Sequence, residues 1–124
     1  MTNTVMSNED EFIYQGLQCK VVLTEIGHRC GYVKLPKDHF AFKMSYDDIA
    51  VNIHGGLTFG PDKLGWIGFD CAHCDDTPQE WTLLKTSNEV KNLAKQINEL
   101  KIENCIKLKL EYMPEWFTKR VCVK

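Results

Sequence analysis

Residues 51–76 read VNIHGGLTFGPDKLGWIGFDCAHCDD and bring glycines, histidines, cysteines and carboxylates together in one short stretch. Residues 50–59 and 64–72 are rich in Val, Ile, Phe and Trp, and the sequence GPDK at 60–63 separates them. Proline presets φ while glycine and aspartate suit turns, so the pattern predicts a β-hairpin. We expect the rest of the chain to be organised around this hairpin.

The predicted hairpin carries several groups that could bind a ligand. A glycine pair is costly inside a strand, so Gly55-Gly56 indicates a bulge or a place where a ligand approaches backbone N–H groups. His54 precedes this pair, and His73 follows the second strand. Asp70 comes directly after an apolar run, and its carboxylate needs a partner. That partner is either a set of backbone N–H groups in the next loop or a ligand.

The remaining elements predict an α+β domain. Residues 12–35 favour a second hairpin that turns at 26–28, and 45–49 favour a short helical turn with Ser45 as its cap. A helix from Ser87 to about residue 100 is indicated by an apolar stripe, and alternation over 106–112 predicts a strand. Val121-Cys122-Val123 would add an edge strand. The expected fold is an antiparallel β-sheet built from hairpins, with one long amphipathic helix packed on it.

Length and composition limit the classes of protein. A chain of 124 residues suits one domain, so we predict a disordered segment at 1–10 and a single domain over 11–124. The net charge of -2, with both signs interspersed, argues against nucleic-acid binding. The sequence has no apolar run near 20 residues and no secretory leader, so we expect a cytoplasmic protein with no membrane partner.

The six cysteines are expected to be reduced thiols, because no secretory segment accompanies them. Cys71 and Cys74 match the C-x-x-C pattern formally. However, Asp75 and Asp76 follow directly, and carboxylates raise the pKa of a nearby thiol, which opposes redox use. We predict no cofactor and no resident metal.

Cations and aromatic rings extend the candidate site. His28 and Arg29 lie at the turn of the second hairpin, where they either face solvent or meet an anionic ligand. Tyr32, Phe59 or Trp66 could supply a stacking surface for such a ligand.

Five blocks of the sequence are familiar together: GHRCGYV at 27–33, PKDH at 36–39, HGGLTF at 54–59, WIGFDCAH at 66–73 and EVKNLAKQ at 89–96. The combination resembles a widespread family of small bacterial and phage proteins that is functionally unassigned. Many relatives continue the fourth block as Ala-Gly-Asp, so the resemblance implies that Asp76 is the matching acid here. It also implies that the family pattern includes His28, Arg29, Cys30, Gly31, Tyr32, His54, Gly55, Gly56, Thr58, Asp70, Cys71 and His73.

Three functions remain open at this point. The first is a small-molecule-binding protein for an anionic, nucleotide-derived ligand, which in a phage could be a sponge that sequesters a host immune signal. The second is a protein-binding inhibitor of a host factor, using Trp116-Phe117. The third is a zinc-dependent hydrolase that draws ligands from His54, Asp70, Cys71, His73 and Cys74. We favour the first, leave a homo-oligomer open, and assign the ligand site to His28, Arg29, Tyr32, His54, Gly55, Gly56, Thr58, Asp70 and His73.

Overall fold

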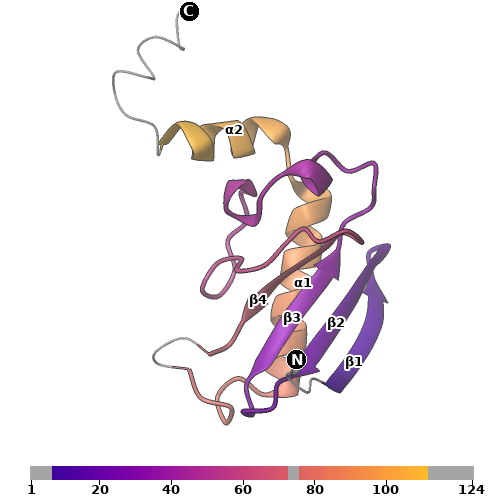
Figure 1. Cartoon of the computed structure of the whole chain (residues 1–124), viewed down its shortest axis with the longest axis vertical. Helices are drawn as coiled ribbons and strands as arrows, with labels where there is room; N and C mark the ends of the chain where they lie inside the picture. Colours follow the sequence, from indigo (N-terminus) through magenta and orange to yellow (C-terminus); the bar gives the residue numbers. More distant parts are fainter. Residues whose placement is uncertain (1–6, 73–75, 112–124) are drawn as a thin grey trace, which may run out of the picture.

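A four-stranded antiparallel sheet and a long helix form the body of the protein, in a computed structural model that describes residues 7–72 and 76–111 (Figure 1). This confirms the predicted α+β class. The strands lie side by side in the order of the sequence. The elements are β1 (Ser7–Tyr14), β2 (Leu17–Leu23), β3 (Arg29–Lys34), β4 (Trp66–Asp70), the 3-10 helices η1 (Phe40–Lys43) and η2 (Tyr46–Asp48), and the helices α1 (Leu83–Glu99) and α2 (Ile102–Glu111).

Tight turns connect the first three strands. Gln15 and Gly16 join β1 to β2 with φ of 51° and 82°, which is the backbone twist that two-residue hairpin turns require. The β2–β3 turn falls where the sequence predicted it, and the N–H of Thr24 donates to the His28 carbonyl at 2.8 Å. Strand β1 begins at Ser7, inside the segment that we expected to be disordered. Ser7, Asn8 and Asp10 pair with β2, with an irregularity at Glu9.

The predicted hairpin around residues 51–76 is only half present. Its second strand is β4, which pairs with β3, but residues 50–58 form no strand and an isolated bridge joins Phe59 to Gly68. A tight turn interrupts the first half, because the N–H of Gly56 donates to the Ile53 carbonyl at 3.0 Å while Gly55 has a φ of 69°. Glycine adopts that conformation without steric cost, so the glycine pair bends the chain instead of extending a strand.

Side chains of α1 satisfy the backbone of this irregular segment. Gln96 accepts a hydrogen bond from the N–H of Asn52 at 2.7 Å and donates one to its carbonyl at 2.8 Å. Glu89 accepts from the N–H of His54 at 2.6 Å. Residues 52–54 therefore lie against the helix, and a partner strand is not needed to pair their backbone groups.

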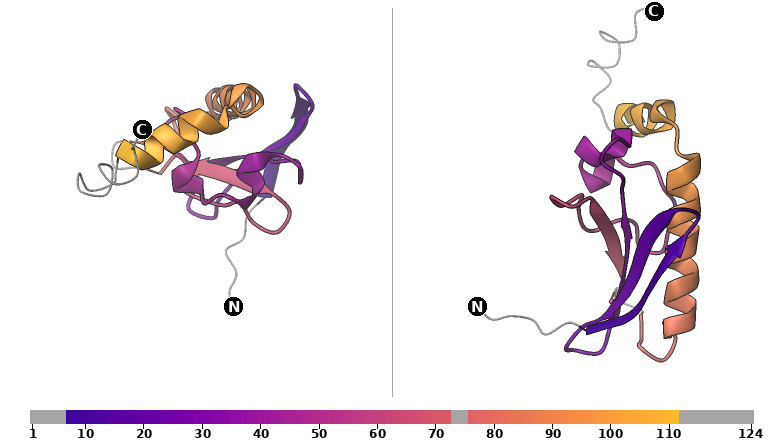
Figure 2. Two further views of the ribbon diagram at one scale, coloured as in Figure 1. Left: turned by 90° about the horizontal axis from the view of Figure 1, so that it is seen from above. Right: turned by 90° about the vertical axis from the view of Figure 1, so that its right-hand side faces the viewer.

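Helix α1 covers one face of the sheet (Figure 2). It begins at Leu83, earlier than predicted, because the Thr82 side chain caps it by accepting from the N–H of Lys85 at 3.2 Å. Ser87, the expected cap, is buried inside the helix. Most of the predicted apolar stripe is confirmed as core: Val90, Leu93, Ala94 and Ile97.

The predicted strand over 106–112 is wrong for the part that the structure describes, since residues 102–111 form α2. Lys, Leu and Glu, which are frequent in this segment, favour a helix. Helix α2 packs beside η2 and does not join the sheet as a strand. Cys105 is buried while Ile106 is half exposed. Residue 112, Trp116-Phe117 and the predicted edge strand at 121–123 lie outside the described residues. Within the described residues, neither α1 nor α2 is long and apolar enough to cross a membrane.

Candidate functional site

Strand alternation divides the predicted site residues between the two faces of the sheet. On β3, Gly31 points toward α1, whereas Tyr32 points to the opposite face, which we call the open face. On β4, Phe69 faces α1, and Gly68 and Asp70 face the same way as Tyr32. His54 instead lies against α1, where its N–H donates to Glu89 at 2.6 Å.

His54 is held on the helix side by contacts within the protein. Its Nε2 lies 2.8 Å from Oδ2 of Asp76, whose side chain is 7% exposed, and its ring stacks on Trp81 with 4.1 Å between centroids. The predicted ligand site does not include Asp76, although the family resemblance marks it as the matching acid. The imidazole is thus paired with an internal carboxylate, which weakens its prediction as an anion-binding group.

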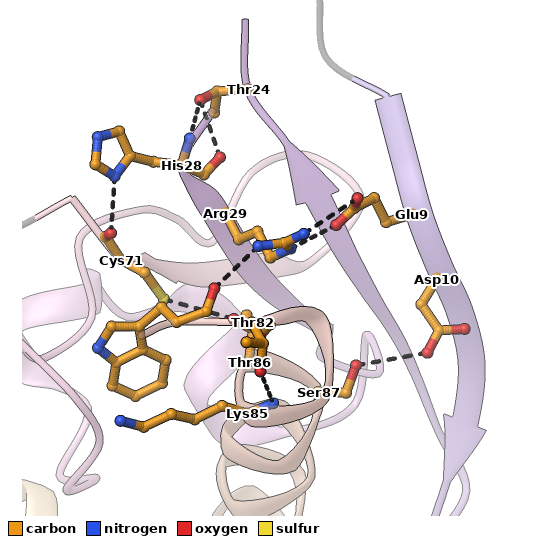
Figure 3. Close-up of polar contacts among 11 residues, drawn as sticks. Glu9, Asp10, Thr24, His28, Arg29, Cys71, Thr82, Lys85, Thr86 and Ser87 are labelled. Carbon is orange, nitrogen blue, oxygen red and sulfur yellow. Dashed lines mark hydrogen bonds and ion pairs between the residues drawn. The ribbon is translucent and has the colours of Figure 1, made fainter. Parts of the chain in front are cut away.

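Arg29 is the centre of a second internal network (Figure 3). Its Nε and Nη2 donate to the two carboxylate oxygens of Glu9 at 2.6 and 3.4 Å, and its Nη1 donates to the Trp81 carbonyl at 3.0 Å. Such a two-pronged contact is a strong form of ion pair. Arg29 therefore ties β1 and β3 to the start of α1, and its side chain is only 17% exposed.

His28 stabilises the neighbouring turn. Its Nδ1 lies 3.2 Å from the Cys71 carbonyl, and the Thr24 hydroxyl bonds both its N–H and its carbonyl (Figure 3). These contacts join the end of β4 to the β2–β3 turn. His28 and Arg29 both serve the fold in this arrangement.

The thiol of Cys71 is buried beneath α1. Burial raises its pKa to about 12 although the Thr86 hydroxyl, 4.0 Å away, acts in the opposite direction. A thiol with so high a pKa is a poor nucleophile and a poor redox group at neutral pH. Cys74 and His73 lie outside the described residues. Among the described residues, no three His, Cys, Asp or Glu side chains are grouped so that they could hold a metal ion.

Asp70 was predicted to accept backbone N–H groups of the next loop or to contact a ligand, and the structure shows one such backbone bond. Its Oδ1 accepts the N–H of Ala72 at 3.1 Å, which turns the chain at the end of β4. On the same face, burial raises the pKa of Tyr32 to about 12, and the negative charge of Asp70 contributes to that rise. Tyr32 is therefore a neutral phenol at physiological pH.

The open face carries a group of aromatic rings, Tyr32, Phe59 and Trp66, which we call the aromatic face. The Tyr32 ring lies across Gly68, where a Cβ atom would come within 2.4 Å of it. The Phe59 ring stands perpendicular to Tyr32 with centroids 5.8 Å apart. Thr58 contributes by its backbone, since its N–H donates to the Gly68 carbonyl at 2.9 Å and so places Phe59 beside β4.

Two lysines accompany these rings. Lys20 Nζ lies 4.3 Å from the centre of the Trp66 ring and 5.4 Å from that of Tyr32, and Lys34 Nζ lies 6.0 Å from Trp66. A cavity of about 330 Å³ opens here. It is lined by Asn8, Lys20, Val22, Tyr32, Phe59, Asp62 and Trp66.

Sequence reasoning identified the rings but missed the lysines and Asp62. Lys20 sits opposite Tyr32 in the β2–β3 register, so an alignment of the two predicted strands would have found it. Gly56 was predicted to offer its backbone N–H to a ligand, but this N–H already donates to the Ile53 carbonyl.

A scan against protein-family models, a search of curated proteins and a search of solved structures each found no match to the chain. The resemblance noted from the sequence blocks therefore stays a prediction.

Proposed function

We propose that the protein binds a small anionic molecule with an aromatic ring, a nucleotide or nucleotide-derived signal, on the aromatic face. The observation that carries this proposal is the joint placement of three rings and Lys20 around one cavity, with Lys34 close to the Trp66 ring beside it. Its volume of about 330 Å³ falls at the lower end of the range typical of small-molecule sites, roughly 300–1,000 Å³.

Stacking supports this assignment. A nucleobase that stacks on an exposed aromatic side chain gains about 1–3 kcal/mol. Phe59 is 43% exposed, and Trp66 is partly exposed, so ring surface is accessible to a ligand. Tyr32, held flat over Gly68, adds a rigid surface that loses little entropy on binding.

Charge supports it as well. The Lys20 ammonium lies close to the Tyr32 and Trp66 rings, where it can bond a phosphate attached to a stacked base. Lys34 approaches the Trp66 ring from the adjacent strand. By contrast, Arg29 and His54, the cations predicted from sequence, are engaged with Glu9 and Asp76.

The biological role we propose is sequestration of the ligand without turnover, as in a phage sponge acting in the cytoplasm. A sponge would return its nucleotide chemically unchanged after the protein is denatured, which chromatography of the released ligand tests.

Calorimetric titration with AMP, GMP, a cyclic dinucleotide and ADP-ribose tests the binding. We expect at least one of them to bind wild-type protein and to bind Trp66→Ala and Lys20→Ala about tenfold more weakly or worse. Lys95→Ala, an exposed position on α1, is the matched charge control and should bind as wild type does. Equal binding by wild type and Trp66→Ala, or no binding of any of the four, would refute the proposal.

A further inference from the structure

Asp62 stands in the same cavity with its carboxylate fixed in place. Its Oδ1 accepts three backbone N–H groups of the turn that leads into β4, at 3.0, 3.0 and 2.9 Å. The donors are Leu64, Gly65 and Trp66. Three such bonds hold Oδ1 against the turn and so fix the orientation of the carboxylate. Every hydrogen bond that the described residues make to this carboxylate goes to Oδ1, so Oδ2 stays outside the network.

Asp62 and Lys20 reach the cavity from opposite sides of Tyr32. Lys20 lies on β2, whereas Asp62 lies in the loop between Phe59 and β4, and Tyr32 on β3 lies between β2 and β4. A ligand that stacks across the rings would therefore meet a cation toward one side and an acceptor-only oxygen toward the other.

We infer that the Asp62 carboxylate accepts hydrogen bonds from the edge of the base and that the ligand is a guanine nucleotide. This inference rests on the proposed function. Guanine carries two neighbouring N–H donors, at N1 and at the 2-amino group, and the lone pairs of Oδ2 can accept from both. Adenine presents a lone pair at N1 in the corresponding position, and that lone pair would face the Oδ2 lone pairs without a proton between them. The carboxylate thus selects for one base and against the other.

Three 5′-monophosphates test the two hydrogen bonds from the base one at a time. GMP has both donors, IMP lacks the 2-amino group, and AMP lacks both the N1–H and the 2-amino group. Calorimetric titration of wild-type protein should give GMP the tightest binding, about tenfold or more tighter than AMP, with IMP between them. Equal affinity for the three would overturn the inference and leave the proposed function standing. Absence of binding by all three, together with the absence of binding by the cyclic dinucleotide and ADP-ribose, would instead overturn the proposed function itself.

Asp62→Asn is the decisive variant. Its amide oxygen can still accept the three turn N–H groups, so the turn is kept, while an NH₂ donor replaces Oδ2. We expect GMP to bind about tenfold more weakly and AMP to bind at least as well as before, so that the preference is lost or reversed. The charge control Asp38→Asn, at an exposed position, should keep the GMP preference. If Asp62→Asn, with an unchanged melting temperature, kept the preference for GMP, Asp62 would not read the base.

Discussion

Nε2 of His54 lies 2.8 Å from Oδ2 of Asp76, and this pair connects the irregular 50–58 segment to the chain that enters α1. The Asp76 side chain is almost fully shielded from solvent, at 7% exposure, and the imidazole also stacks on Trp81. A shielded carboxylate that loses such a partner is left without part of its compensation for desolvation. The pair is therefore a structural link, and its removal should be felt in stability.

We predict that His54→Ala lowers the free energy of unfolding by about 1–3 kcal/mol, the usual cost of leaving a buried polar group without its partner. Urea denaturation at neutral pH measures it. Asn52→Ala is the control in the same segment, because its contacts with Gln96 use backbone atoms, and it should change stability by less than about 0.5 kcal/mol. A His54→Ala protein as stable as wild type would show that the pair contributes nothing.

Arg29→Lys should be destabilising although it keeps the charge. The guanidinium makes two bonds to Glu9 and one to the Trp81 carbonyl, and an ammonium cannot reproduce that fork. We expect a loss of about 1–2 kcal/mol in urea denaturation. Lys34→Arg, a reverse change on the open face, should stay within about 0.5 kcal/mol. Equal stability of Arg29→Lys and wild type would contradict the role of Arg29 in holding β1, β3 and the Trp81 carbonyl together.

The parts of the fold that could be predicted depend on local pattern. The β2–β3 hairpin and the stripe of α1 follow from alternation and from the 3.6-residue period, which are properties of short segments. The strand expected over 50–59 failed because side chains of Gln96 and Glu89, more than thirty residues away, satisfy its backbone. The alternation over 106–111 predicted a strand that did not form: in the described part of the chain these residues belong to α2, which contacts η2 and pairs with no described strand.

The candidate site was predictable in composition but not in geometry. Tyr32, Phe59 and Trp66 were identified as a stacking surface, and β-strand register then brings them together. The positively charged groups that face a ligand could not be predicted, because the sequence does not show that Arg29 pairs with Glu9 and His54 with Asp76. Only the folded chain decides which cations remain to meet a ligand.

Gly31→Ala tests the close contact between β3 and α1. A Cβ atom at this position would lie 2.5 Å from Cγ2 of Val90 and 2.6 Å from Cζ of Phe69, both buried. Overpacking of this kind costs typically about 1–3 kcal/mol, which a thermal or urea melt would register. Adding Val90→Ala should make the Gly31→Ala change less costly, because it removes the nearest methyl group. If the cost were the same in both backgrounds, Val90 would not be the clashing group.

The buried thiol of Cys71 should make stability fall in alkaline solution. Its pKa rises from an ordinary 9.0 to about 12 because burial disfavours the thiolate, so between these values the folded protein keeps a proton that the unfolded chain releases. The contribution to folding is complete below pH 9 and is lost as the pH rises, by up to about 1.4 kcal/mol per pH unit. Cys71→Ala should make the decline shallower by about that amount. Urea denaturation from about pH 8 to about pH 11 gives the slopes, with Val21→Ala as a control that truncates the core without removing a titrating group. Parallel slopes in wild type and Cys71→Ala would mean that the thiol ionises as readily in the folded protein as in the unfolded chain.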